Sequence, residues 1–413
     1  MKSFDITNLS NGIKVITRKN PNTPRIAINI FIDSGIKYEK LPGTATLAGR
    51  LLLQGTEKRS ATQIAEEIDK NSIELGIETK QDYTKVKAVF LNETLDVTLD
   101  ILSDILKNST FKDFEKETYK FKGEIDVELD SPRAKAADNL VKHMYPDHPY
   151  GHTYTKVLDS LDKITVDAVK DFYSSTFNPE KMNIVVVGDI NKEEIVPLLE
   201  KHFGDIRKNT STELTLKSVE IKENNIVTIA KNDAAQAQII QGWIVPNILN
   251  QDYPALTVLN TILGSSGLSS RLFVELRDKK GLAYVVRSSY DPLKHSGSFS
   301  VYIATAPGNI KVSLDGFNEE IRKLQTEPVS EVESENAKNN ILGKRAFFHE
   351  TNAQQAYYLG HYDILGLGAD FDDNFAEKIK QVKAEDIKHV ANKYLSANSI
   401  ISILAPEEYL SAL

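Results

Sequence analysis

The 413-residue chain contains no cysteine, which excludes disulfide bonds, thiolate nucleophiles and cysteine-ligated zinc. It also lacks a basic excess, because 50 Lys and Arg stand against 58 Asp and Glu. A net charge of −8 argues against nucleic acid as a main partner, since phosphate binding requires a basic face. No apolar run reaches the length of a membrane span, and the N-terminal segment has no apolar signal core. We therefore expect a cytoplasmic protein that binds neither nucleic acid nor membranes.

An internal repeat divides the chain. The segment from Ile164, ITVDAVKDFYSSTFNPEKMNIVVVGD, has the same pattern as the segment from Val382, VKAEDIKHVANKYLSANSIISILAP. Each places an acidic residue (Asp167 or Glu385, 218 positions apart) at a helix start, followed by a short amphipathic helix and an apolar strand. The length also exceeds what one hydrophobic core usually organises, so two domains are expected.

Two further matches extend the repeat. The segment from Leu95 (LDVTLDILSDIL) corresponds to that from Ile310 (IKVSLDGFNEEI), and GIKVITRKNPNTPRIAINIFID corresponds to NIVTIAKNDAAQAQIIQGWIVP. The pattern predicts a tandem duplication with domains at 1–206 and 219–413. The polar segment 207–218, RKNTSTELTLKS, is the predicted linker.

Each half has the pattern of an α+β domain. Alternating residues such as Ile26–Phe31 predict a half-buried antiparallel sheet, and amphipathic segments such as Leu95–Leu106 predict helices that cover it. Strand runs and helix runs are partly segregated, which favours α+β over a doubly wound parallel sheet. The predicted fold is therefore two tandem homologous domains, each an antiparallel sheet covered by helices.

Three segments, taken in order, resemble the pitrilysin-like zinc metallopeptidases, which include insulysin and the two-domain subunits of the mitochondrial-processing-peptidase class. LSNGIKV is similar to the family's opening hairpin, SGIKYEKLPGTATLAGRLLLQGT to its zinc-motif region, and SSRLFVELRDKKGLAYVV to its second-domain signature. The resemblance runs nearly end to end. It implies the LuxS and processing-peptidase-like fold, with two domains related by a pseudo-twofold axis.

The zinc motif is degenerate in this chain. In active members of the family a helix reads His-x-x-Glu-His, because histidines at i and i+4 share one face and grip one metal ion, while the Glu acts as general base. The resemblance places Thr46 and Arg50 at the histidine positions, Gly49 at the base and Glu124 at the third ligand. It implies that this chain binds no metal and that zinc belongs to a partner.

Glu124 leaves two readings open. It pairs with Arg50, replacing the attraction between ligand and zinc by an ion pair, or it is a solvated helix carboxylate. A nearby strand, IELGIETKQDYT, resembles the family's substrate-side edge strand but carries Gly76 and Ile77 where Asn-Ala is usual. The first domain has thus lost several catalytic features together.

The second domain keeps its own feature. Arg277 is expected to end a helix, Gly281 to break it and Tyr284 to begin a strand. The resemblance implies that Arg277 and Tyr284 hydrogen-bond the substrate carbonyl, and an arginine with a phenol suits an oxyanion. The alternative is that Arg277 pairs with surface acids and Tyr284 half-fills a core.

Other candidate sites are weaker. His148 and His152 have i, i+4 spacing, but Pro149 and Gly151 between them disfavour a helix, so the spacing does not place both imidazoles on one face. The segment 264–270, GSSGLSS, lacks the lysine and the preceding strand of a phosphate-binding loop, and a substrate-side or hinge loop is expected.

The sequence favours one of three functions. The leading hypothesis is a zinc-less subunit of a heteromeric metalloendopeptidase, inactive alone, that donates Arg277 and Tyr284 to the active site of a zinc-binding sister chain acting on peptides. The rival is a non-catalytic peptide-binding or scaffold subunit of a larger assembly. An independent hydrolase has no support, because no nucleophile–base constellation is present.

Overall fold

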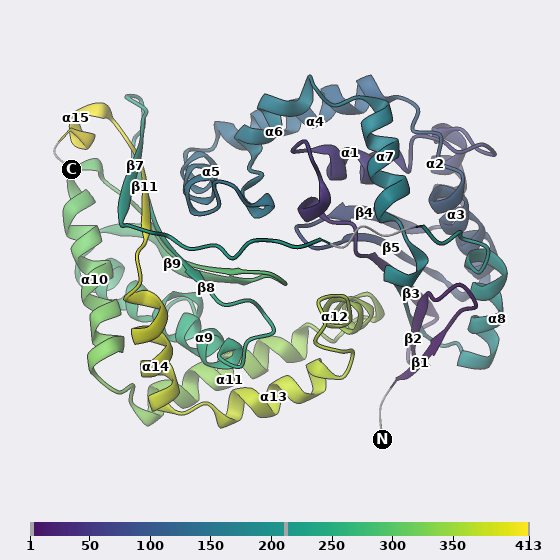
Figure 1. Cartoon of the computed structure of the whole chain (residues 1–413). Coiled ribbons are helices and arrows are strands. Elements are labelled where there is room, and N and C mark those ends of the chain that lie inside the picture. The colour runs from purple at the N-terminus through teal and green to yellow at the C-terminus, as the bar shows by residue number, and fades with distance from the viewer. Residues whose placement is uncertain (1–3, 210–213, 412–413) are drawn as a thin grey trace. The chain divides into compact units, whose positions relative to one another are not determined.

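The chain folds into two compact units, each built around one β-sheet (Figure 1). The computed structural model describes residues 4–209 and 214–411. The first unit comprises Met1–Ile125, Thr155–Thr215 and Phe347–Asp372, and the second Asp126–Tyr154, Leu216–Ala346 and Asp373–Leu413. Within the described residues, no helix is both long and apolar enough to cross a membrane.

The first sheet has six strands in the order β1-β2-β6-β3-β5-β4. Only β2 and β6 pair in parallel, and every other pair of neighbours is antiparallel. The strands are β1 (Asp5–Asn8), β2 (Lys14–Lys19), β3 (Arg25–Ile32), β4 (Glu74–Thr79), β5 (Thr84–Leu91) and β6 (Met182–Gly188).

The central strand β3 differs from the half-buried strand that was predicted. Its residues from Ile26 to Ile32 are all buried, since helices cover both faces of the sheet at this point. The second face is covered by α12 (Asn352–Ile364), which packs on β3 and β6. The other helices that lie wholly or mainly in this unit are α1 (Thr44–Leu51), α2 (Ala61–Lys70), α3 (Leu95–Lys107), α4 (Phe114–Asp130), α6 (Tyr154–Leu161), α7 (Val166–Thr176) and α8 (Lys192–Phe203).

The second sheet repeats this plan with five strands in the order β7-β11-β8-β10-β9. Its one parallel pair is β7 with β11. The strands are β7 (Asn225–Ala230), β8 (Ala237–Val245), β9 (Ala283–Pro292), β10 (Gly297–Thr305) and β11 (Ile400–Ala405). The helices are α5 (Pro132–Met144), α9 (Tyr253–Asn260), α10 (Ile310–Thr326), α11 (Glu331–Phe347), α13 (Phe371–Gln381), α14 (Ala384–Leu395) and α15 (Glu407–Leu410).

The predicted duplication is confirmed element by element. Asp167 and Glu385 are the second residues of α7 and α14, and each helix leads into the strand of the parallel pair, β6 or β11. Leu95 and Ile310 are the first residues of α3 and α10. The first sheet adds β1 outside β2, whereas β7 is an edge strand of the second sheet. The pseudo-twofold relation between the two units stays a prediction.

Each half of the sequence contributes one helix to the unit that is built mainly from the other half. Helix α5, from the N-terminal half, packs on β8 and β11 of the second unit, and α12, from the C-terminal half, packs on the first. Each compact unit therefore contains segments from both halves of the sequence. The domain boundaries 1–206 and 219–413 stay a prediction. Residues 210–213 of the predicted linker 207–218 lie outside the described residues.

Candidate functional site

Helix α1 carries three of the four positions that the resemblance assigns to the zinc motif. Thr46 lies one turn before Arg50, and both side chains are partly exposed. Gly49 is buried where α1 packs against β4, and a Cβ atom there would lie 2.9 Å from Thr79 Oγ1. A glutamate at this position would require Thr79 to shift. The position that the resemblance assigns to the general base thus holds a glycine, which allows α1 to pack closely on β4.

Arg50 and Glu124 form a bidentate ion pair. Arg50 Nη1 donates to Glu124 Oε2 at 2.9 Å, and Nη2 donates to Oε1 at 2.7 Å. The pairing decides between the two readings of Glu124 in favour of the ion pair. The arginine side chain is 24% exposed and the glutamate 61%, so the pair links α1 and α4 at a partly exposed position.

Two more residues of α4 complete the surroundings of Arg50. Glu117 Oε2 lies 3.5 Å from Arg50 Nε, and the guanidinium carbon is 5.4 Å from the centre of the Phe121 ring. Residues 117, 121 and 124 follow one another at i, i+4 and i+7, which places them on one face of the helix. Sequence reasoning missed Glu117, although its spacing of one heptad from Glu124 was a usable signal.

The electrostatics of this cluster stabilise the charged forms of both Arg50 and Glu124. The hydrogen bond to Glu124 raises the pKa of Arg50, and the same bond holds the pKa of Glu124 below its usual range. The position that the resemblance gives to a metal-binding histidine therefore carries a permanent cation. With Thr46 and Gly49 at the other positions, the residues present do not fit zinc.

The second unit brings Arg277 and Tyr284 together. Arg277 lies in the π-helical turn Phe273–Lys279, which ends where Leu282 N donates to Leu276 O at 2.8 Å. Gly281 makes this ending possible with its φ of +63°. Tyr284 is the second residue of β9. The predicted order of helix, break and strand is confirmed, although the last helical turns are π rather than α.

Arg277 bends back over Tyr284. Its Nη1 donates to the backbone oxygen of Tyr284 at 2.9 Å, and its guanidinium carbon lies 4.8 Å from the Tyr284 ring centre and 4.5 Å from that of Phe273. Within residues 4–209 and 214–411, Arg277 forms no ion pair, in contrast to the surface-acid alternative. The Tyr284 side chain is 76% exposed. The site thus presents a cation and a phenolic donor on one surface.

The remaining candidates do not form sites. His148 begins a short 3₁₀ turn at Pro149–Gly151 and accepts a hydrogen bond from Tyr150 N, so His148 and His152 do not share a helix. The segment 264–270 begins inside the π-helical turn Thr261–Ser265, so no strand directly precedes it. No group of three His, Asp or Glu side chains suited to a metal ion occurs in the part of the chain that the structure describes.

Comparison with known protein families identifies the family of the chain. The sequence profile "Insulinase (Peptidase family M16)" matches residues 14–156, and "Peptidase M16 inactive domain" matches residues 163–341. The chain belongs to peptidase family M16. The two matches follow each other along most of the chain, as the predicted resemblance requires. The first match lies within the N-terminal half, and the second runs from residue 163 across the predicted linker into the C-terminal half.

Relatives of similar length occur in bacteria. A protein of Rickettsia felis is 29% identical over 412 residues, 98% of each chain, and one of Mycobacterium leprae is 28% identical over 406 residues, 97% of this chain and 91% of the relative. Both are named uncharacterized zinc proteases. This M16 chain differs from what such a name requires, because its motif positions hold Thr46, Gly49 and Arg50.

Solved structures confirm the fold. A protease from Helicobacter pylori superposes with a TM-score of 0.90 at 22% identity, covering 98% of this chain and 99% of the other. A protein from Pseudomonas fluorescens, described as a peptidase M16 inactive domain, gives 0.89 at 20% identity and covers 98% of both chains. At these identities the likeness establishes the M16 fold alone.

Proposed function

We propose that this chain is the zinc-less subunit of a two-chain M16 peptidase. It supplies Arg277 and Tyr284 to the substrate carbonyl in the active site of a zinc-bearing sister subunit. The observation that carries this proposal is the Arg50–Glu124 ion pair, which occupies the metal-motif positions of the first unit. A chain with a stabilised arginine there depends on another chain for the hydrolytic step.

The chemistry of the second site supports the same proposal. Peptide hydrolysis builds negative charge on the carbonyl oxygen, and fixed donors aimed at that oxygen lower the barrier. Arg277 and Tyr284 are donors of the right kind, and the exposed phenol is accessible to a partner's substrate. Without a substrate, the guanidinium keeps its hydrogen bond to the Tyr284 carbonyl, which holds it beside the ring. The proposed assembly is a cytoplasmic heterodimer acting on peptides.

The rival is a scaffold subunit that only holds peptides. The two proposals differ at Arg277 and Tyr284, since a scaffold does not need an exposed phenol next to a stacked guanidinium. Tyr284→Phe separates them, because it deletes one hydroxyl and keeps the ring that Arg277 packs on. The assay uses the complex reconstituted from this chain and a sister chain with an intact His-x-x-Glu-His motif.

The expected result is a large loss of turnover with assembly intact. Removal of one oxyanion donor typically lowers kcat on the order of a hundredfold or more. Arg277→Lys keeps the charge but loses the planar fork, so a sizeable loss there points to geometry. Tyr119→Phe, at another exposed tyrosine, is the matched control and should leave turnover unchanged. Turnover within about twofold of wild type for Tyr284→Phe favours the scaffold.

A further inference from the structure

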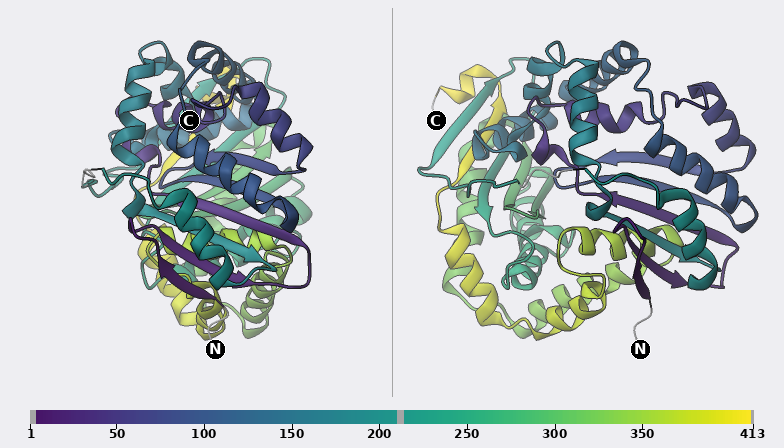
Figure 2. Two further views of the ribbon diagram at one scale, coloured as in Figure 1. Left: turned by 90° about the vertical axis from the view of Figure 1, so that its right-hand side faces the viewer. Right: turned by 45° about the vertical axis from the view of Figure 1, so that its right-hand side comes forward.

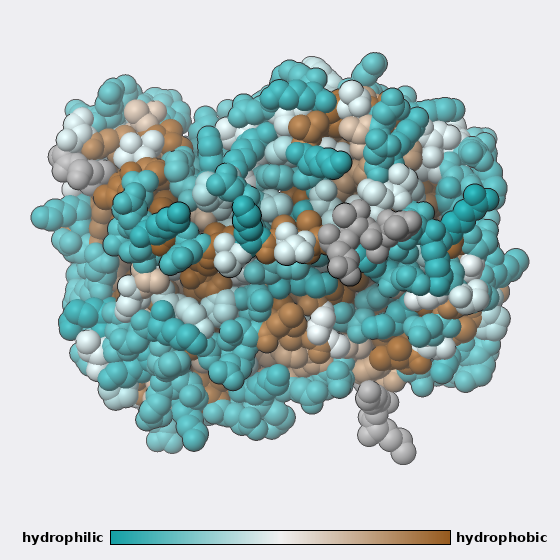
Figure 3. Space-filling view, viewed as in Figure 1, coloured by the Kyte–Doolittle hydropathy of each residue, from teal (hydrophilic) through white to brown (hydrophobic). Residues whose placement is uncertain are grey.

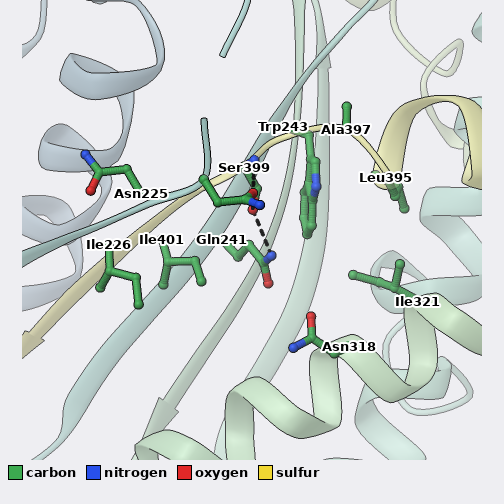
Figure 4. Close-up of a pocket in the computed structure, with 11 residues that line it drawn as sticks. Asn225, Ile226, Gln241, Trp243, Asn318, Ile321, Leu395, Ala397, Ser399 and Ile401 are labelled. Carbon is green, nitrogen blue, oxygen red and sulfur yellow. Dashed lines mark hydrogen bonds between the residues drawn. The ribbon is translucent and has the colours of Figure 1, made fainter. Parts of the chain in front are cut away.

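The second unit contains a cavity of about 440 Å³ between its sheet and α10 (Figure 4). Its floor is formed by Gln241 and Trp243 of β8, which lie on the same face of the strand because they are two positions apart. Asn318 of α10 points toward Gln241 from the opposite wall in Figure 4. Hydrophobic surface is visible in the region of β7 and β11 (Figure 3). None of the described residues that line the cavity is acidic or basic.

Gln241 faces this cavity with an unused acceptor. The residue is 7% exposed, and its Oε1 accepts no hydrogen bond from the described residues. The orientation of the amide is fixed by its other end, because Nε2 donates to Ser399 Oγ at 3.0 Å and that hydroxyl lies 3.4 Å from Asn224 Oδ1. A buried carbonyl without a donor costs free energy. The packing of the described residues alone leaves this acceptor unsatisfied.

The first unit shows how this position is filled when it serves packing alone. Ile30 lies between Val86 and Ile184 in the first sheet, as Gln241 lies between Val301 and Ile401 in the second. Ile30 is 1% exposed. The same comparison puts Ile32 at the position of Trp243. The duplicated scaffold therefore accepts aliphatic side chains at both positions.

The helix on the other wall differs between the units as well. In the first unit α8 packs beside α3 (Figures 1 and 2). Ser103 is the ninth residue of α3, and its Oγ lies 3.4 Å from Nδ1 of His202 in α8. Asn318 is the ninth residue of α10. In the described part of the second unit, β11 is followed by the four-residue α15, which contacts β7 instead. In the first unit α8 lies beside α3. At the corresponding place beside α10, the second unit has the cavity.

We propose that this cavity binds a small uncharged ligand that carries a primary amide. An uncharged ligand is required, because no side chain of the lining offers a counter-charge to a desolvated ion. Gln241 Oε1 needs an N–H or O–H donor, and the oxygen of Asn318 is turned toward the same space in Figure 4. One NH2 group can donate to both. Trp243 and Ile401 supply an apolar wall for the rest of the ligand.

Trp243 makes the test specific, since it is the one tryptophan of the chain. The full chain labelled with 5-fluorotryptophan gives a single ¹⁹F resonance, which is followed during titration with benzamide. Benzamide is expected to shift this resonance saturably in the millimolar range. N,N-dimethylbenzamide lacks the N–H donors and benzoate carries a charge, so each should bind about tenfold more weakly or not at all.

Gln241→Leu is the decisive variant. It should weaken benzamide binding about tenfold while the unfolding temperature stays the same or rises, because the unpaired carbonyl is removed. Gln381→Leu, at an exposed glutamine outside the cavity, is the matched control and should bind as wild type. Absence of a saturable shift with benzamide, equal shifts with all three probes, or unchanged binding by Gln241→Leu would each overturn the proposal. If Gln241→Leu unfolds, Asn318→Leu replaces it with the same expected loss.

Discussion

At the scale of single residues, Arg50 carries the chemistry of the first unit. Its guanidinium is surrounded by the carboxylates of Glu124 and Glu117 and by the Phe121 ring, so charge, hydrogen bonding and an aromatic face act on one group. Glu117 is 4% exposed and depends on Arg50 and Lys120 for positive charge. Removal of Arg50 therefore leaves the buried Glu117 carboxylate with Lys120 as its remaining cationic partner among the described residues.

Arg50→Met is expected to lower the free energy of unfolding by about 1–3 kcal/mol, because buried Glu117 loses a charged partner. Lys208→Met breaks the half-exposed pair with Glu180 and should cost less than about 1 kcal/mol. Urea unfolding at pH 7 measures both. An Arg50→Met cost no larger than that of Lys208→Met would show that the cluster is only a surface pair.

The same ion pair predicts a pH dependence. The folded-state pKa of Glu124 lies below its ordinary value, mainly because Arg50 donates hydrogen bonds to the carboxylate. Its stabilising contribution is complete above the unfolded pKa and is lost as the pH falls through the folded one. The difference between wild type and Glu124→Gln should therefore shrink below pH 4.5. A difference that stayed constant down to pH 3 would contradict this assignment.

At the scale of elements, α12 and α5 pack on their sheets in opposite ways. One pairing places a glycine on the helix against a large side chain of the strand, and the other places the glycine on the strand. In the first unit the glycine is on the helix, where a Cβ on Gly360 of α12 would lie 2.2 Å from the Phe31 ring of β3. In the second unit the glycine is on the strand, where Gly242 of β8 faces Leu140 and Met144 of α5. Each helix therefore reaches its sheet by close packing of a large group against a glycine.

Gly360→Ala should destabilise the chain by about 1–3 kcal/mol, because the added methyl overlaps the buried Phe31 ring. Gly343→Ala, in α11 where nothing lies within 4 Å, is the control and should stabilise by up to about 1 kcal/mol through helix propensity. The midpoint of urea unfolding reports both. Equal effects of the two alanines would argue against tight packing of α12 on the sheet.

Element patterns explain how far the sequence alone could lead. Helix α7 and strand β6, with their copies α14 and β11, followed from acidic helix starts and apolar runs, because these signals are local. The motif positions offered the Arg50–Glu124 pair as one of two readings, and the structure was needed to decide between them. The exchange of α5 and α12 between the halves did not follow from the sequence, because an amphipathic helix shows that it has a partner face and not which sheet provides it. The burial of β3 on both faces was missed for the same reason.

At the scale of the whole molecule, duplication gave the M16 chain two units with the same strand order and different chemistry. The first unit holds an arginine in the helix that the resemblance assigns to the zinc motif, and the second has an arginine beside an exposed tyrosine. The second unit also has polar side chains at positions where the first has aliphatic ones, as Gln241 and Ile30 show. One scaffold therefore supports sites of different kinds.

The zinc content of the purified chain tests the account most directly. The chain alone is dialysed against trace zinc, freed of unbound metal and analysed for zinc per polypeptide. Because Arg50 is held at a ligand position by Glu124, we predict no stoichiometric zinc, with Arg50→His as a variant that restores one ligand for comparison. One tightly bound zinc ion per wild-type chain would contradict the claim that this subunit relies on a partner for its metal.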